Sequence, residues 1–376
     1  MDWAWFAIKP SNYVSALCYS VLKVEPYSRC PVGCMYCYAR WYWGHSAGPQ
    51  PEHVRAFEAL AHRLSKVSGP RPFFRVSTLT DPLQPAEARH RLTLRVMRAA
   101  LRYGVPIVIN TKTALIAEEP WLGIASKLAE EGLILVQVSA AFVDETAKAL
   151  EPGAPSTTTR LEVIEVLRQH GVPVVARVQP LMPGLEDEHV AVAADAMSAG
   201  AEGVIGESLR ETREGWERVY RVIGEEPPSE LVPYDVSGEG RLLHPTLEWR
   251  RRMHERLEAV ARAFGRPYSP CKEWVMPRSD GRDCCLTWLA LRGRTLRPTL
   301  HEYAAWLAEG GGEGWDDFIR WCSARLAPKR YVCGEALEKY PRPVARALRY
   351  HERKLSRVVS DEALMRRLGL GGEEGG

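Results

Sequence analysis

The segment YSRCPVGCMYCYARWYWG, residues 27–44, places three of the chain's nine cysteines within eight positions. Cys30, Cys34 and Cys37 follow the spacing CxxxCxxC, and Gly33 relaxes the turn of the loop that carries them. Three thiolates on one tight loop can point at a common centre. Structural zinc sites use four protein ligands, as four-iron clusters usually do. Three thiolates would leave one iron of such a cluster open to a small molecule.

Composition is that of a globular protein of one large or two smaller domains. The chain has 376 residues, of which 45% are hydrophobic and 26% charged. Its apolar runs are too short to cross a bilayer, and its first residues lack a signal-peptide pattern, so we predict a cytoplasmic protein without a membrane partner. In a reducing compartment, clustered cysteines favour metal ligation over disulfides. The net charge of +3 does not by itself imply a nucleic-acid partner.

Short β-branched runs alternate with helix-period segments beyond the cysteine loop. The predicted strands are residues 15–24, 73–78, 105–110, 133–139, 172–178 and 202–206. Amphipathic helices are predicted between them, for example at 89–104 and 157–171. Successive strands start about 30 to 40 residues apart, the length of one strand–helix unit. Six such units predict an α/β fold, a partial (β/α)6 TIM-like barrel with functional residues at the carboxyl ends of its strands.

The composition changes near residue 268, so we predict a barrel over residues 1–267 and a mainly helical, cysteine-containing region over residues 268–376. The later cysteines are Cys271, Cys284, Cys285, Cys322 and Cys333. One interpretation is an auxiliary metal or iron–sulfur site, because four thiolates can complete such a site. Its predicted ligands are Cys271, Cys284 or its neighbour, Cys322 and Cys333. Buried free thiols and disulfides are the alternatives. Cys18 is predicted to be a core residue.

The segment CPVGCMYC resembles the signature of the radical S-adenosylmethionine (radical SAM) enzymes, whose fold is a six-stranded partial TIM barrel. The resemblance implies that Cys30, Cys34 and Cys37 ligate a 4Fe-4S cluster and that S-adenosylmethionine (SAM) binds its open iron. In that family, reductive cleavage of SAM yields a 5′-deoxyadenosyl radical, which removes hydrogen from a substrate. It also implies a reducing electron donor of the flavodoxin or ferredoxin type.

Two further segments, TLTDPLQPAEARHRLTLRVMRAALRYGVPIVINTKTAL and LEPGAPSTTTRLEVIEVLRQHGVPV, are similar to the spore-photoproduct-lyase-like branch of that family. The resemblance spans about residues 20–210. It implies that Thr80, Lys112 and Ser139 contact SAM, and Tyr36, beside the last loop cysteine, is a fourth candidate. A hydroxyl–ammonium set suits a carboxylate and a ribose.

Each of these residues also has a purely structural interpretation. Thr80 and Asp81 can form a turn and helix cap, and Lys112 can be a solvated lysine. Glu151 with Arg160 is predicted to be a surface ion pair.

One position departs from the branch. The photoproduct lyases carry a cysteine two residues before the position of Thr80, where it returns a hydrogen atom to the repaired base. Here that residue is Thr78, and an O–H bond is much stronger than an S–H bond. We therefore do not predict spore photoproduct repair.

Three hypotheses on function stay open at this point. The first is a radical SAM enzyme acting on nucleic acid or a nucleotide, which the branch and the arginine-rich segments near residues 250–266 and 345–357 favour. The second is a radical SAM enzyme that modifies a peptide or metabolite with the help of an auxiliary cluster. The third is a non-catalytic metal-binding module, in which His45 could complete a zinc site. The catalytic residues, the substrate and the oligomeric state are not predicted.

Overall fold

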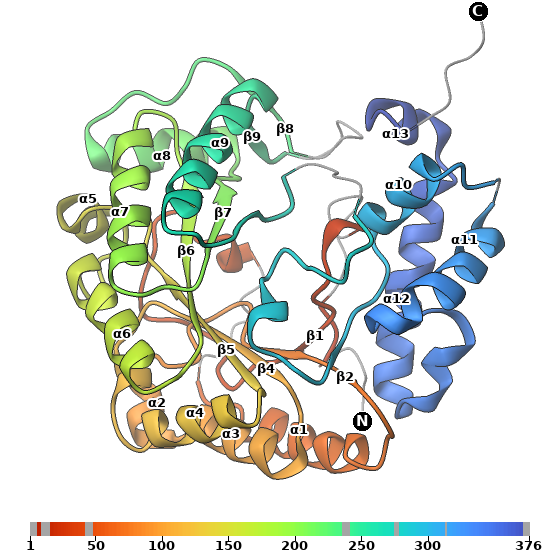
Figure 1. Cartoon of the computed structure of the whole chain (residues 1–376). Coiled ribbons are helices and arrows are strands. Elements are labelled where there is room, and N and C mark those ends of the chain that lie inside the picture. Colours follow the sequence, from red (N-terminus) through yellow and green to blue (C-terminus); the bar gives the residue numbers. More distant parts are fainter. Residues whose placement is uncertain are drawn as a thin grey trace, which may run out of the picture.

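A single parallel sheet of seven strands organises the fold (Figure 1). The structure is a computed structural model and describes residues 6–8, 16–41, 48–234, 241–273, 278–312 and 314–370. The strands, in their order across the sheet, are β1 (Leu22–Val24), β3 (Phe74–Val76), β4 (Ile107–Thr111), β5 (Ile134–Ser139), β6 (Val174–Leu181), β7 (Val204–Ser208) and β10 (Tyr268–Pro270). Every neighbouring pair is parallel, so the carboxyl ends of all seven strands meet at one edge.

All six predicted strands are present, and the predicted α/β partial barrel is confirmed. The first is shorter than predicted, because of the described residues 16–24 only Leu22–Val24 pair with β3. The seventh strand, β10, was not predicted. It has three residues and ends in a proline, which leaves no periodic pattern to recognise. Since β10 pairs with β7, the sheet extends past residue 267, and the division of the chain there stays a prediction.

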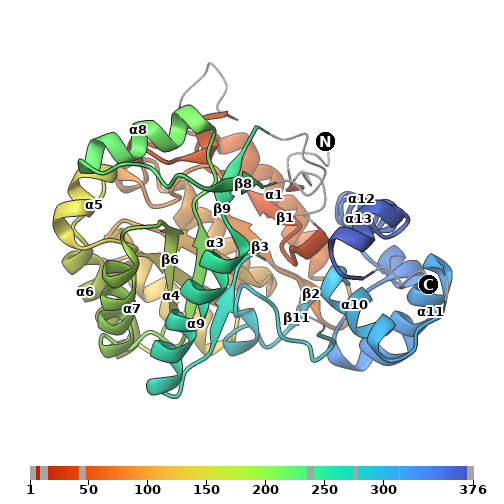
Figure 2. The ribbon, with the colours of Figure 1, turned by 90° about the horizontal axis from the view of Figure 1, so that it is seen from above.

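Helices cover the convex face of the sheet (Figure 1). They are α1 (Pro51–Leu64), α2 (Pro85–His90), α3 (Leu92–Tyr103), α4 (Trp121–Glu130), α6 (Thr157–Gln169), α7 (Glu186–Ser198) and α9 (Leu247–Ala263). The helices α5 (Asp144–Leu150) and α8 (Arg213–Ile223) instead lie together near the cysteine loop (Figure 2). Local signals set their ends: α3 ends at Gly104 in the left-handed conformation, and the Ser156 hydroxyl accepts the Thr159 amide to begin α6. Both predicted helices are thus confirmed.

The strands are buried on both faces. Residues such as Ile107 and Val136 pack under the outer helices, whereas Val108 and Leu135 face the concave side. There they meet the segment that follows β10, including Cys271 and its neighbours, which Figure 1 draws in teal inside the curve of the sheet. Burial on both faces explains why the strands read as continuous apolar runs.

The remaining helices gather beside one edge of the barrel (Figure 2). They are α10 (Leu300–Ala308), α11 (Trp315–Trp321), α12 (Arg342–Val359) and α13 (Glu362–Arg367). Tyr303, Trp306 and Phe318 lie at the centre of a small apolar core of their own. Two small two-stranded sheets complete the fold. One pairs β2 (Arg71–Pro72) with β11 (Arg294–Thr295), and the other pairs β8 (Leu231–Pro233) with β9 (Leu243–Pro245). None of the described helices has the length and apolarity to span a membrane.

Candidate active site at the carboxyl ends of the strands

The cysteine loop follows β1 and rests on the segment that follows α5. The Met35 amide donates to the Leu150 carbonyl over 2.9 Å, and the Gly153 amide donates to the Val32 carbonyl over 2.9 Å. A Cβ atom at Gly153 would lie 2.7 Å from the Pro31 carbonyl oxygen, so only glycine allows this approach. Gly33 has a φ of +69°, as its predicted role in the turn requires. The residues E–P–G at 151–153 therefore hold the loop in place.

The thiols of this loop have the chemistry of cluster ligands. Cys30, Cys34 and Cys37 are all half-buried, and the Cys37 amide donates to the Cys34 carbonyl over 3.1 Å. Burial raises the pKa of Cys30 to about 11 and that of Cys34 to about 12, and it also raises the pKa of Cys37. Iron binding would therefore displace thiol protons at neutral pH. A set of three thiolates suits an iron–sulfur cluster.

Within the described ranges, no group of three or more His, Cys, Asp and Glu side chains is placed to hold a metal ion. The side chains of Cys30, Cys34 and Cys37 therefore do not converge on one ion in this structure. His45, the alternative fourth ligand, lies outside the described residues.

Three of the four predicted SAM contacts come together beside Cys34. Lys112 follows β4 and Ser139 ends β5, and the Lys112 Nζ lies 2.8 Å from the Ser139 Oγ. The same Nζ lies 2.9 Å from Glu151 Oε1 and 5.7 Å from the centre of the Tyr36 ring. The Tyr36 hydroxyl donates to Glu151. Burial and the Glu151 charge raise the pKa of Tyr36 well above its ordinary value, so Tyr36 is a neutral donor here.

Thr80, the fourth predicted contact, lies in a turn that links Cys30 to β4. The Asp81 amide is hydrogen-bonded to the Cys30 sulfur, and the Asp81 carboxylate accepts the Lys112 amide over 2.7 Å. Thr80 itself shares a hydrogen bond of 2.7 Å with Ser77. Asp81 does not cap α2, which begins after Gln84. The turn therefore joins two parts of the site instead of starting a helix.

The pair of Glu151 and Arg160 is the main correction to the sequence prediction. Both side chains are 1% exposed or less, so this is a buried ion pair and the prediction of a surface pair was wrong. Arg160 Nη2 lies 2.5 Å from Glu151 Oε2. Burial alone would raise the pKa of Glu151, but the charges of Lys112 and Arg160 outweigh it and leave the pKa below its ordinary value. Glu151 is therefore an anion that holds Lys112 in the site.

Glu25 is a site residue that the sequence prediction missed. It follows β1 directly, and its carboxylate accepts the Ser77 hydroxyl over 2.6 Å and the Thr78 hydroxyl over 2.7 Å. The Thr78 amide also donates to it, over 2.9 Å. The hydroxyl proton at the position of the lyase cysteine is thus engaged by a carboxylate. The sequence could have indicated Glu25, because it is a polar residue at the carboxyl end of a predicted strand.

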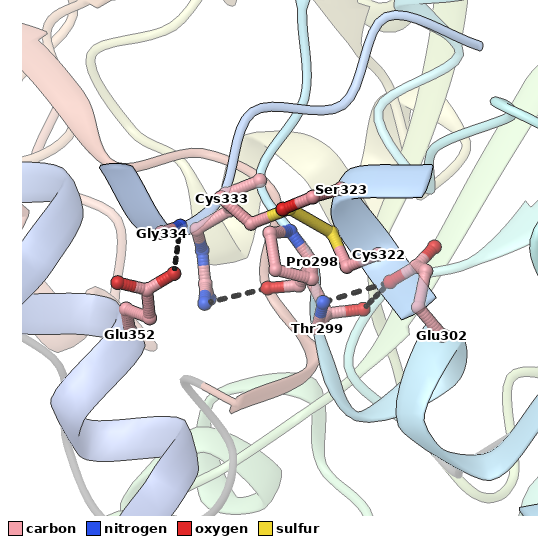
Figure 3. The surroundings of a disulfide bond; sticks show 9 residues. Pro298, Thr299, Glu302, Cys322, Ser323, Cys333, Gly334 and Glu352 are labelled. Carbon is pink, nitrogen blue, oxygen red and sulfur yellow. Dashed lines mark hydrogen bonds between the residues drawn. A yellow bond between two sulfur atoms is a disulfide. The ribbon is translucent and has the colours of Figure 1, made fainter. Parts of the chain in front are cut away.

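The later cysteines form two groups instead of one. Cys322 and Cys333 are joined in a disulfide (Figure 3), which corrects the predicted auxiliary ligand set that included both. The bridge lies between the start of α10, where Thr299 caps the helix, and α12, where Glu352 accepts the Gly334 amide over 2.9 Å. Its two cysteines are not free to bind a metal. Cys271, Cys284 and Cys285 are free and buried.

Comparisons with known proteins give one family model and several relatives. A family model described as the Radical SAM superfamily matches residues 24–197. An uncharacterized protein of Mycobacterium tuberculosis is 31% identical over 207 residues, 51% of this chain and 60% of that protein. An uncharacterized protein of Methanocaldococcus jannaschii is 26% identical over 172 residues, 44% of this chain and 61% of that protein. The chain thus matches about three fifths of the length of these relatives.

The fold is also similar to that of spore photoproduct lyase. In a structure of that enzyme complexed with a dinucleoside spore photoproduct, 67% of this chain aligns with 76% of the lyase chain, at a TM-score of 0.50 and 13% sequence identity. At that identity the likeness concerns the fold alone.

Proposed function

Because this chain belongs to the radical SAM superfamily, we propose that it is an enzyme that holds a 4Fe-4S cluster on Cys30, Cys34 and Cys37 and binds SAM at the iron they leave free. When bound and reduced, this pair of cofactors supplies a 5′-deoxyadenosyl radical that removes hydrogen from a substrate. A reducing protein of the flavodoxin or ferredoxin type would be the electron donor. The cytoplasmic location stays a prediction.

The chain's own residues prepare a binding site for the methionine part of SAM. Lys112 presents an ammonium group beside Cys34, and Ser139 and Glu151 fix its position. An ammonium held in this way attracts a ligand carboxylate by a charge-assisted hydrogen bond. Tyr36 offers a ring face, and Thr80 offers a hydroxyl that also contacts Ser77. These side chains orient the cofactor, and the buried ion pair behind them keeps water away from the ammonium.

The observation that supports the proposal best is the placement of Lys112 among Ser139, Glu151 and the Cys34 thiol. Anaerobic reconstitution with iron and sulfide, followed by dithionite and SAM, tests it. We expect 5′-deoxyadenosine from the intact chain and none from Cys34→Ala. A folded, iron-loaded chain that forms no 5′-deoxyadenosine would refute the proposal that the protein is a radical SAM enzyme. Colourless protein that contains zinc would instead support the metal-binding module.

For the substrate we propose a nucleic acid or a nucleotide. The solved structure of similar fold carries a dinucleoside, and α12 presents the exposed side chains of Arg342, Arg346, Arg353 and Arg357. The reaction would differ from that of the lyase, because Thr78 is bound to Glu25 and is a poor hydrogen donor. Gel-shift titrations with RNA and DNA over a salt series test this, since phosphate contacts weaken steeply with salt. Absence of binding at low salt would favour a peptide or metabolite as the substrate.

A further inference from the structure

Four basic side chains, the basic cluster, meet on the concave side of the sheet. They are Arg75 on β3, Arg177 on β6, Arg210 after β7 and Lys272 after β10. Two shared acceptors join them. The Gln137 side-chain oxygen accepts Arg75 over 3.1 Å and Arg177 over 3.3 Å. The Glu207 carboxylate lies 3.0 Å from Arg177 and 3.8 Å from Lys272, and it also pairs with Arg210.

The alternation of side chains along the strands explains this placement. Val175 and Ile205 face the concave side of the sheet. Because side chains alternate, Arg177 and Glu207, each two positions further on, face it too. Arg177 is also the register partner of Ser139, one of the predicted SAM contacts, and neighbouring strands lie only about 4.8 Å apart. The basic cluster therefore borders the place where SAM would bind.

Positive charge exceeds negative charge within the basic cluster. Among the described residues, Glu207 is the sole carboxylate that forms an ion pair with any member, and Arg75 pairs with none. Cations in excess of carboxylates are costly at a buried site unless an anion compensates them. The internal alternative is a thiolate at Cys285, whose sulfur lies 3.6 Å from Arg75. One thiolate would still leave two of the four cations without an anion.

The basic cluster is reachable from solvent and lies near the cysteine loop. The side chains of Lys272 and Arg210 are 31% and 17% exposed. Burial raises the pKa of Tyr38, which directly follows Cys37, and the charges of Lys272 and Arg75 act against that rise. An anionic group held here would thus keep the rest of its molecule close to the loop.

A buried acceptor without a partner lies on the neighbouring strand. Asn110 on β4 is the register partner of Gln137, and it faces the concave side because Val108 does so. Its side-chain oxygen accepts no hydrogen bond from the part of the chain that the structure describes. Such a buried acceptor is costly unless a donor satisfies it. A ligand hydroxyl or amino group would do so, which points to a molecule that carries donors as well as negative charge.

We propose that the basic cluster binds the terminal phosphate of a nucleotide, an assignment that rests on the proposed function and narrows its substrate to a nucleotide instead of a polymer. A phosphate monoester carries a charge of about −1.5 to −2 at neutral pH, whereas an internal phosphodiester carries a single charge. The monoester matches the excess of cations better. Guanidinium groups also bind phosphate oxygens in pairs, and the sugar and base supply donors for Asn110.

The test is a calorimetric titration of the full, reconstituted chain, kept oxidised so that SAM is not cleaved. Nucleoside 5′-monophosphates are titrated in the presence of SAM, which fills its own site and keeps the probes out of it. We expect at least one of them to bind and inorganic phosphate to compete with it. The corresponding nucleoside and dinucleoside monophosphate should bind at least about tenfold more weakly, because each lacks the charge of the monoester.

Two variants locate the binding. Arg75→Gln and Lys272→Gln each remove one charge from the basic cluster, and each should weaken binding of the monophosphate about tenfold. Their matched controls are Arg353→Gln and Lys127→Gln, at exposed positions of α12 and α4. Both controls should bind the monophosphate as tightly as the unchanged chain.

Circular dichroism and a melting curve establish that each variant is folded, and Lys272→Gln, at a partly exposed position, decides the test should Arg75→Gln not fold. Absence of binding by every monophosphate overturns the proposal, as does unchanged affinity in the folded variants of the basic cluster. Equal binding of the dinucleoside monophosphate also overturns it, because the site would then take an internal phosphodiester.

The outcome is separable from that of the proposed function, because the titration requires no cleavage of SAM. Formation of 5′-deoxyadenosine without binding of any monophosphate would leave the proposed function standing and remove the phosphate site. Binding of the monophosphate without 5′-deoxyadenosine would keep the phosphate site and remove the proposed function.

Discussion

Replacement of Lys112 by Met removes the cation proposed to bind the SAM carboxylate, while keeping most of the volume of the side chain. A hydrogen bond to a charged group contributes about 1.5–3 kcal/mol. The Lys112 side chain is 14% exposed, so it is screened only in part, and we take about 2 kcal/mol. That corresponds to a roughly thirtyfold weaker Kd for SAM. Glu151 keeps its buried partner Arg160 in this variant, so the protein should remain folded.

Isothermal titration of SAM into reconstituted protein under anaerobic conditions measures this effect. The matched control is Lys148→Met, because Lys148 is exposed on α5 and has no assigned role. It should bind SAM as tightly as the unchanged chain. Equal affinities for Lys112→Met, Lys148→Met and the unchanged chain, at equal iron content, would refute the role given to Lys112.

Three further results are expected. Glu151→Ala should lower the free energy of unfolding by about 3–5 kcal/mol in chemical denaturation, because it leaves the buried Arg160 without its carboxylate; a loss below about 1 kcal/mol would show that the pair is not structural. Burial lowers the pKa of His189 to about 4 from 6.5, so only the unfolded chain takes up this proton as the pH falls from 6.5 to 4. Unfolding should become easier by up to about 3 kcal/mol over that interval, and His189→Gln should reduce this slope, whereas an unchanged slope would contradict the assignment. Peptide mapping without reductant should find Cys322 linked to Cys333, and reduction should cost about 2–3 kcal/mol of stability; alkylation of both as free thiols would contradict the pairing.

Sequence periodicity was sufficient for the parts of the fold in which local patterns and tertiary environment agree. The strands β4 to β7 are apolar runs because both of their faces are buried, and the predicted helix α6 between them begins at a Ser156 N-cap. β10 escaped prediction because its three residues pair with β7 only in the folded chain. No local pattern marks such an edge strand.

The candidate site divides in a similar way. Lys112 and Ser139 could be predicted because Lys112 directly follows β4 and Ser139 ends β5, and these strands are neighbours in a parallel sheet. The burial of Glu151 and Arg160 could not be predicted. An acidic and a basic residue nine positions apart form the same sequence pattern whether the pair lies on the surface or in the core. The predicted ligand set of the later cysteines was wrong for another reason. The spacing of cysteines in a sequence does not determine which of them meet in the fold, and here Cys322 and Cys333 form a disulfide.

The most direct measurement is the electron paramagnetic resonance spectrum of the dithionite-reduced protein, recorded with and without SAM. A small molecule that takes up the vacant position on the cluster must alter its signal, and we expect a changed spectrum that Cys34→Ala does not give. Superimposable spectra in the presence and absence of bound SAM would mean that the three cysteines leave no iron open to SAM, and the proposed mechanism would be wrong.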